Sequence, residues 1–249
     1  MAGAGRNPRF APVAAKEFDM EITWLGHSGF RLETGAEVLL IDPWLTGNPS
    51  FPEDQWADAT KGVTAILLSH GHGDHAGNAI AIAKEAGVPI YCIHELSKWV
   101  SKQGAEAVGF GKGGTVQIGD AAVSMVTAVH SSSVDFGDGD VIYAGGEAGF
   151  VIKAEGRSIY FSGDTDVTME MDIIADRYKP DVGILCAGGH YTMDMAGAAY
   201  AAKRFFDFKT LIPCHYGTFP ILEQSAQPLI DALPDVDVRV MTVMQAETL

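Results

Sequence analysis

The stretch Ser69-His70-Gly71-His72-Gly73-Asp74-His75 is the most informative part of this sequence, because three histidines and a carboxylate fall within six positions. It comes directly after Val63-Thr64-Ala65-Ile66-Leu67-Leu68, an apolar run that predicts a buried strand. Imidazole nitrogens and carboxylate oxygens are ligands that suit zinc and similar divalent ions. A histidine-rich surface loop without an ion is the alternative, but ligand-type residues with glycine spacers behind a buried strand favour metal binding.

The order of residues within this stretch predicts contacts with two ions. His70 and His72 lie two positions apart, so on an extended segment both side chains point the same way and can hold one ion. The intervening glycines let the backbone turn tightly without a side-chain clash. Asp74 and His75 then fall on the turn into a predicted helix, where they can face a second ion.

Three further candidate ligands stand at the ends of other predicted strands. His130, Asp164 and His215 each come directly after an apolar run. Loops of this kind often carry functional residues on a rigid scaffold. Taken singly, each residue would be interpreted as a hydrogen-bonded structural residue. The histidine-rich stretch reverses that interpretation, because a pair of ions needs more ligands than this stretch supplies.

Apolar strand patterns occur along the chain both as consecutive hairpins and interleaved with helical patterns. Strands are predicted over 20–25, 30–33, 37–43, 63–69, 88–93, 115–118, 121–129, 148–154, 157–162, 181–186, 210–214 and 237–243, and helices over 76–86, 95–102, 168–178, 195–206 and 221–232. This mixture predicts an α/β (α+β) fold in which two mixed β-sheets pack face to face with helices outside. We interpret residues 1–18 as a flexible N-terminal arm and residues 19–249 as a single domain.

Composition narrows the classes of function. The chain has 249 residues and a formal net charge of −15, so binding to nucleic acid or to an anionic membrane is disfavoured and a small-molecule substrate is expected. Cys92, Cys186 and Cys214 are interpreted as buried thiols in a reducing cytosol. The N-terminal residues contain no long apolar run of the kind found in signal peptides. These features predict a cytoplasmic protein.

Taken together, these motifs resemble the metallo-β-lactamase fold superfamily. Within it they resemble the UPF0173 group of metal-dependent hydrolases, which is related to a bacterial ascorbate-phosphate lactonase. The resemblance spans roughly residues 20–225 and rests on the following segments: Ile22–Ser28, Ile41–Pro49, His70–His75, His130–Ser133, Gly163–Thr165, Gly188–Met193 and His215–Pro220. Tyr191 and Cys214 depart from the pattern, since the group usually has Phe and Met there.

The resemblance implies an αββα sandwich with a binuclear metal site at one edge of the two sheets. It implies that His70, His72 and His130 hold the first ion and that Asp74, His75 and His215 hold the second. Asp164 would bridge the two ions. Asp42 would support the histidine loop without binding a metal ion itself. Two divalent ions per chain are expected, with zinc favoured and manganese or iron as alternatives.

Several residues near these motifs are candidates for roles in substrate binding. His27 and His190 lie in glycine-rich turns, where each could contact substrate, transfer a proton or orient a metal ligand. Trp44, Phe51 and Trp56 belong to a proline-rich segment and either wall an apolar pocket or cover the core. The acidic run Asp135–Asp140 is interpreted as a solvated loop near the mouth of the site.

The predicted activity is that of a metal-dependent hydrolase. A hydroxide that bridges the two ions would attack an ester, lactone or phosphoester bond of a small molecule. Asp74, Asp164, His190 and His27 are the catalytic candidates, and either aspartate could carry the proton to the leaving group. A non-catalytic metal-binding relative and a di-iron protein that reduces oxygen or nitric oxide are the alternatives. Assembly as a homo-oligomer is a further expectation.

Overall fold

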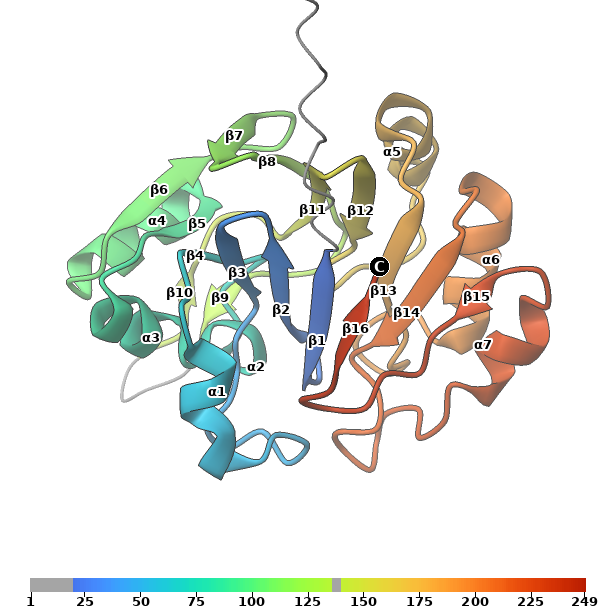
Figure 1. Ribbon diagram of the computed structural model, residues 1–249, viewed down its shortest axis with the longest axis horizontal. Coiled ribbons are helices and arrows are strands. Elements are labelled where there is room, and N and C mark those ends of the chain that lie inside the picture. The colour runs from blue at the N-terminus through green and yellow to red at the C-terminus, as the bar shows by residue number, and fades with distance from the viewer. Residues whose placement is uncertain (1–19, 136–139) are drawn as a thin grey trace, which may run out of the picture.

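Two seven-stranded β-sheets pack face to face and helices cover their outer faces in the computed structural model, which describes residues 20–135 and 140–249 (Figure 1). This is the αββα arrangement that the sequence predicts. The arm predicted over residues 1–18 lies outside the described residues, and so do positions 136–139 of the acidic run Asp135–Asp140.

The first sheet collects the N-terminal strands and one strand from the C-terminus. Its order is β16-β1-β2-β3-β4-β5-β6, antiparallel from β16 to β3 and parallel from β3 to β6. The strand bounds are β1 Glu21–Gly26, β2 Gly29–Thr34, β3 Glu37–Ile41, β4 Ala65–Leu67, β5 Ile90–Ile93, β6 Ala107–Phe110 and β16 Ala246–Thr248.

The second sheet has a similar plan. Its order is β15-β14-β13-β12-β11-β8-β7, parallel from β15 to β12 and antiparallel from β12 to β7. The strand bounds are β7 Thr115–Ile118, β8 Ala121–Thr127, β11 Ala148–Ala154, β12 Arg157–Phe161, β13 Val182–Cys186, β14 Thr210–Cys214 and β15 Asp237–Val238. A separate two-stranded pair joins β9 Ser133–Val134 to β10 Ile142–Tyr143.

Helices lie outside both sheets, so that α1, α3 and α4 belong to the first sheet and α5, α6 and α7 to the second (Figure 1). The helix bounds are α1 Trp56–Thr60, α2 Gly73–Ala76, α3 Ala79–Ala86, α4 His94–Lys102, α5 Glu170–Tyr178, α6 Met195–Phe205 and α7 Gln227–Ala232. Among the described residues, none of these helices combines the length and the apolarity that crossing a bilayer demands.

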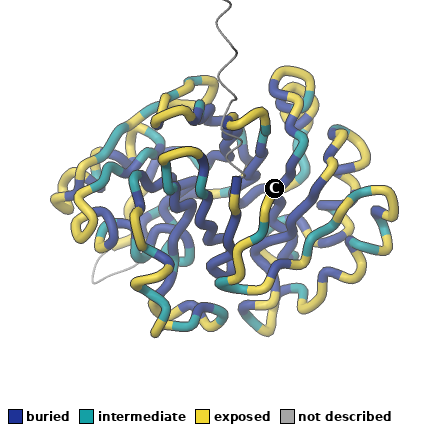
Figure 2. The backbone as a smooth tube through the Cα atoms, viewed as in Figure 1, coloured by how far each residue is buried: buried dark blue, intermediate teal, exposed yellow. Residues whose placement is uncertain are grey.

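The side chains of the first sheet point alternately to its two faces, and each face packs in its own hydrophobic core. Because side chains alternate along a strand, Leu39 and Ile41 join the core between the sheets, whereas Leu40 packs on the outer face with the helices. Phe30 of the first sheet meets Phe161 of the second edge to face, with ring centroids 6.2 Å apart. Figure 2 shows the buried strands at the centre and exposed loops at the periphery.

Two predicted segments are shorter in the structure by five residues or more. The strand predicted over 237–243 ends at Val238, because the chain leaves the second sheet and turns at Met244 (φ 62°) to deliver β16 to β1. The helix predicted over 221–232 begins only at Gln227. Pro228 stands in its first turn, where proline's missing N–H is not needed.

Candidate metal site

Segments from both sheets meet at one edge of the sandwich and bring all seven predicted ligands together. β4 leads into the loop that carries His70 and His72, and helix α2 carries Asp74 and His75. The remaining three predicted ligands follow strands of the second sheet, namely His130 after β8, Asp164 after β12 and His215 after β14. Loops that follow strand ends in this way place side chains from distant segments beside one another.

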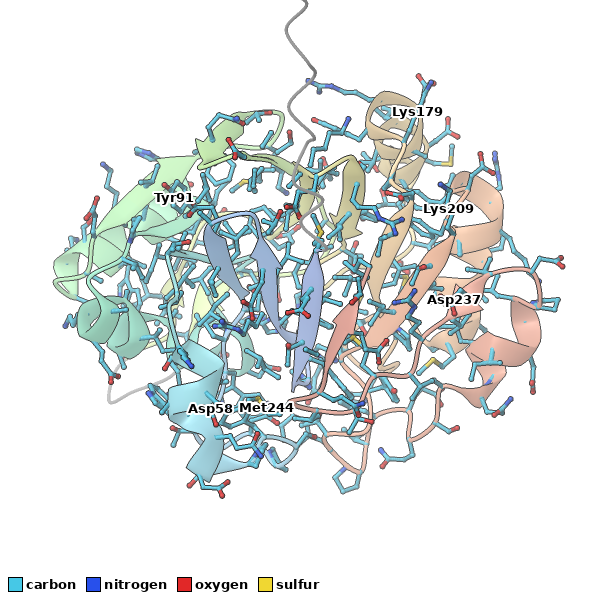
Figure 3. The ribbon with its side chains drawn as sticks, in the orientation of Figure 1. Asp58, Tyr91, Lys179, Lys209, Asp237 and Met244 are labelled. Atoms are coloured by element: carbon cyan, nitrogen blue, oxygen red, sulfur yellow. The ribbon has the colours of Figure 1, made fainter. Side chains whose placement is uncertain are left out.

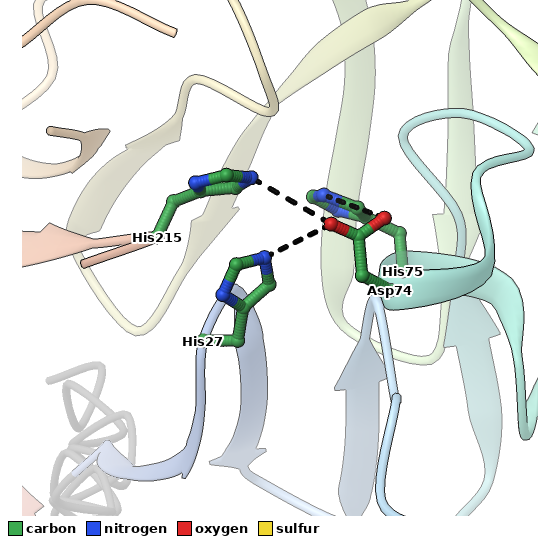
Figure 4. A group of neighbouring side chains, drawn as sticks. All are labelled: His27, Asp74, His75 and His215. Carbon is green, nitrogen blue, oxygen red and sulfur yellow. Dashed lines mark hydrogen bonds and ion pairs between the residues drawn. The ribbon is translucent and has the colours of Figure 1, made fainter. Parts of the chain in front are cut away.

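Among the described residues, the candidate ligand atoms form three groups, in each of which they lie within 4.8 Å of one another. The first comprises His70, His72 and His130, with His70 Nε2 3.0 Å from His72 Nδ1. The second consists of His27, Asp74, His75 and His215 (Figure 4). The third joins these two, because it contains His70 and His75 together with Asp42. The first two groups correspond to the ligand sets that the family resemblance implies, with His27 as an additional member.

Asp164 lies between the two groups. Its Oδ2 is 3.3 Å from His75 Nε2, 3.0 Å from His215 Nε2 and 3.7 Å from His130 Nε2. The carboxylate is 3% exposed, so solvent cannot compensate its charge. A carboxylate in this position is suited to contact two cations at once.

Unpaired buried atoms indicate that a cation fits this site. Within the described residues, His75 Nε2 and Asp164 Oδ1 are buried without a hydrogen-bond partner. Such groups are costly to bury unless something satisfies them. An imidazole nitrogen and a carboxylate oxygen are ligand atoms that a divalent cation would satisfy.

The electrostatics of the metal-free protein support the same conclusion. Burial favours the protonated form of Asp164, but the attraction of His215 and His75 outweighs it and holds the pKa of Asp164 well below its usual value. Burial likewise opposes the charge on His75, yet Asp164 and Asp74 raise the pKa of His75 well above 6.5. A proton on His75 therefore takes the place of a cation. Metal binding would release it, because only the neutral imidazole can bind a metal.

Asp42 fixes the orientation of the histidine loop, as expected from the sequence. Its Oδ1 accepts the Ser69 amide at 2.8 Å and its Oδ2 lies 2.8 Å from His75 Nδ1. Both Asp42 and His75 are fully buried. Because His75 Nδ1–H donates to this carboxylate, the Nε2 that faces Asp164 is the nitrogen that would bind a metal once His75 has lost its second proton.

His27 belongs to the cluster. Its Nε2 lies 3.1 Å from Asp74 Oδ2, its Nδ1 lies 2.9 Å from Thr218 Oγ1 and its carbonyl accepts the His215 amide at 3.0 Å. Burial, followed by the nearby His215, lowers the pKa of His27 to about 4. The neutral ring therefore connects Asp74 to Thr218, and the His27 carbonyl connects the turn between β1 and β2 to His215.

His190 lies outside the cluster. It is exposed, its ring contacts Tyr191 at 4.5 Å between centroids, and it lines a different hollow together with Glu223. The cause is local. Gly188 packs so closely on His215 that an added Cβ would lie 2.0 Å from the His215 carbonyl oxygen, and Gly189 (φ 75°) then turns the chain outward.

A cleft of about 640 Å³ opens above the cluster. It is lined by Trp44, His72, Asp74, His130, Ser131, Asp135, Asp164, Tyr191, His215, Phe219 and Ile221. Of the aromatic residues considered from the sequence, Trp44 reaches the cleft, whereas Phe51 is buried in the core and Trp56 packs against it. Cys214 is buried in the hydrophobic core between the two sheets.

Sequence reasoning did not single out Phe219 and Ile221. Their signal was present, because Phe219 belongs to the segment His215-Tyr216-Gly217-Thr218-Phe219-Pro220 that carries part of the family resemblance. Nothing in a strand or helix pattern identifies which residue of such a loop returns over the site.

Comparisons with known proteins find relatives that match most of the chain. Residues 38–216 match the model of the β-lactamase superfamily domain. A UPF0173 metal-dependent hydrolase of Dinoroseobacter shibae is 60% identical over 227 residues, which cover 91% of this chain and 98% of that protein. A second, from Roseobacter denitrificans, is 59% identical over 220 residues, which cover 88% of this chain and 95% of that protein.

A solved structure shares both the fold and part of the sequence. Igni18, described as a novel metallo hydrolase from the archaeon Ignicoccus hospitalis, superposes with a TM-score of 0.82 at 29% identity. The superposition covers 93% of this chain and 99% of Igni18.

Proposed function

Since the chain belongs to the β-lactamase superfamily and, within it, to the UPF0173 metal-dependent hydrolases, we propose that it cleaves an ester or lactone bond of a small molecule with two divalent ions bound. The observation that carries this proposal is the position of Asp164 between two groups of histidines at the floor of one cleft.

The proposed ligand assignment follows these two groups. His70, His72 and His130 would hold one ion, and Asp74, His75 and His215 the other, with Asp164 in contact with both. Zinc is the favoured metal and manganese or iron the alternatives, since histidine and aspartate accept all three. Bound there, two such ions would polarise the scissile carbonyl and lower the pKa of a coordinated water to about 7.

The protein's own groups would then manage orientation and protons. Asp74, whose carboxylate has its pKa lowered by His75 and His27 against the effect of burial, is ionised and 31% exposed, and it lines the cleft. It would accept the proton that the attacking water loses and pass this proton to the leaving group. His27 would hold Asp74 in position through its 3.1 Å contact. Asp164 is the second candidate for proton transfer, because its carboxylate also lies within the cluster.

The cleft favours a carbonyl substrate over a phosphoester. Among the described residues, neither lysine nor arginine lines it, so no side chain would add a cation to the two ions in binding a phosphate group. A volume of about 640 Å³ suits a small molecule. The three buried unpaired thiols support the prediction of a reducing, cytoplasmic setting.

An activity screen tests the proposal. Zinc-loaded and manganese-loaded protein should hydrolyse at least one of phenyl acetate, γ-butyrolactone and a longer-chain lactone faster than 4-nitrophenyl phosphate. His72→Ala should lower the rate at least about a hundredfold, since even residues that only support a metal ligand are worth 10- to 100-fold. His94→Ala, which changes an exposed histidine at the start of α4, is the matched control and should leave the rate unchanged. Full activity of His72→Ala would place the chemistry elsewhere.

A further inference from the structure

We propose that the substrate is an uncharged ester or lactone that carries an apolar ring, and that Trp44, Phe219 and Ile221 select this ring. This inference rests on the proposed function, because it concerns the same cleft and the same bond. It is carried by the uneven distribution of apolar and charged side chains around the cleft.

An aromatic platform stands beside one half of the metal cluster. The rings of Trp44 and Phe219 stack with centroids 5.8 Å apart and an interplanar angle of 26°. Both rings also meet His27 nearly edge to face, Trp44 at 5.4 Å and Phe219 at 5.8 Å. His27 contacts Asp74, and Asp74 contacts His215. A flat ring lying on this platform would therefore hold the scissile ester or lactone bond close to Asp74 and His215.

Two large apolar side chains are exposed at the rim of the cleft. Ile221 is 55% exposed and Tyr191 is 60% exposed, and both line the cleft together with Phe219. Exposed apolar groups gathered around a concave site typically mark a place where a ligand covers them. Ile221 and the Trp44–Phe219 platform thus provide apolar surfaces for one ring.

The charges around the cleft disfavour an anionic group on that ring. Of the carboxylates that line the cleft, Asp74 and Asp164 are assigned to the metal ions, which would offset their charge, whereas Asp135 is not, and none of the described lining residues is basic. Basic side chains gather instead around a separate hollow, where Lys179 and Lys209 are labelled in Figure 3, together with Lys153 and Arg157. A carboxylate or phosphate far from the scissile bond would therefore find no counter-charge and would be repelled.

The first arm of the test compares substrates and variants. The value of kcat/KM should be at least about tenfold higher for benzyl acetate than for 4-(acetoxymethyl)benzoate, and higher than for ethyl acetate, whose alkoxide leaving group has a similar basicity to that of benzyl acetate. Phe219→Ala and Ile221→Ala should each lower kcat/KM for benzyl acetate about tenfold or more, the effect of removing apolar contacts from a hydrophobic pocket, with metal content unchanged. The value for ethyl acetate should fall by a clearly smaller factor.

Two variants keep this arm interpretable. Phe219→Leu preserves apolar bulk, so it separates loss of the aromatic contact from disturbance of the loop: kcat/KM for benzyl acetate should fall about threefold, less than in Phe219→Ala. Ile173→Ala removes an apolar side chain that is 64% exposed on α5, far from the cleft lining, and should change nothing.

The second arm measures binding without hydrolysis. Ligand-observed NMR should detect benzyl alcohol bound to the metal-loaded protein, with affinity lowered at least about threefold in Ile221→Ala and Phe219→Leu and unchanged in Ile173→Ala. Ring binding that depends on these residues, without hydrolysis of any ester, would overturn the proposed function and leave the ring site standing. Hydrolysis that is indifferent to the ring, to its charge and to both variants would overturn this inference and leave the function standing.

Discussion

At the scale of single residues, Asp42 shows how the site is prepared before any ligand arrives. It has a positive φ of 45°, an uncommon conformation for a residue other than glycine, and this backbone turn aims its carboxylate at Ser69 and His75. Each oxygen accepts a hydrogen bond from the histidine loop or α2. The conformation is retained because the surrounding contacts determine it.

Replacing Asp42 by asparagine should therefore weaken metal binding without removing a ligand. An amide NH₂ facing His75 Nδ1–H would place two donors together or force the other tautomer on the ring, and support groups of this kind are worth about 10- to 100-fold in metal affinity. Competition with a chelator measures the change. Asp58→Asn, at an exposed position labelled in Figure 3, is the control, and equal affinities of both variants would contradict this role.

At the scale of elements, the parallel strands β13 and β14 determine where His215 lies. Cys186 lies opposite Cys214 in the register of these two strands, at the end of each strand. Gly188, two residues after Cys186, packs on the His215 carbonyl. The strand ends thus leave no room for a side chain at Gly188.

Gly188→Ala should displace His215. The new Cβ would lie 2.0 Å from the His215 carbonyl oxygen, and relief of such overpacking typically costs about 1–3 kcal/mol of stability. Thermal unfolding and metal content measure the effect. Gly111→Ala, where an added Cβ meets no atom within 4 Å, should remain like the wild type. Unchanged metal content in Gly188→Ala would contradict the proposed packing role.

Asp181 joins the beginnings of β12 and β13 and should make stability depend on pH. Its carboxylate accepts the Ser158 amide at 2.8 Å and Arg157 Nη1 at 2.9 Å. Burial raises the pKa of Asp181, but these two partners outweigh it and the net shift is downward. A lowered folded-state pKa means that the stabilisation is present above the unfolded-state value of about 3.9 and is lost as the pH falls through the folded-state value.

Asp181→Asn should accordingly lower the free energy of unfolding by about 1 kcal/mol at pH 7, a value kept small by partial exposure. The difference from the wild type should shrink at pH 3. Urea unfolding of both metal-free proteins at the two pH values measures it, and a difference that grows toward pH 3 would contradict the sign.

Much of the site is predictable from the sequence for a physical reason. Ligands such as His70, Asp164 and His215 directly follow buried strands, and strand ends are fixed by the core. His190 shows the limit, since its preceding glycines indicate a turn but not the direction of that turn. The same applies to Ile221, which returns to the cleft through a loop without periodicity, and to β16, whose pairing with β1 spans nearly the whole chain.

At the scale of the whole molecule, packing between and outside the sheets isolates all three cysteines. Burial raises the pKa of Cys92 and of Cys186 to about 12 and the pKa of Cys214 well above its usual value. Thiols that are both buried and protonated react slowly, because the thiolate is the nucleophile.

The native protein should therefore resist a disulfide reagent such as 5,5′-dithiobis(2-nitrobenzoate) at pH 8, whereas the urea-unfolded chain should release three equivalents, one for each free cysteine. Absorbance at 412 nm gives the count. Rapid reaction of the folded protein would show that at least one of these sites is open to solvent.

One cluster of histidines and aspartates is proposed to hold a pair of cations, and elemental mass spectrometry of protein purified without chelators can count them. We expect about two divalent ions per chain in the wild type and fewer in Asp164→Asn, whose amide is a poorer ligand between the two groups. A wild-type content near zero, or an Asp164→Asn content equal to the wild type, would contradict it.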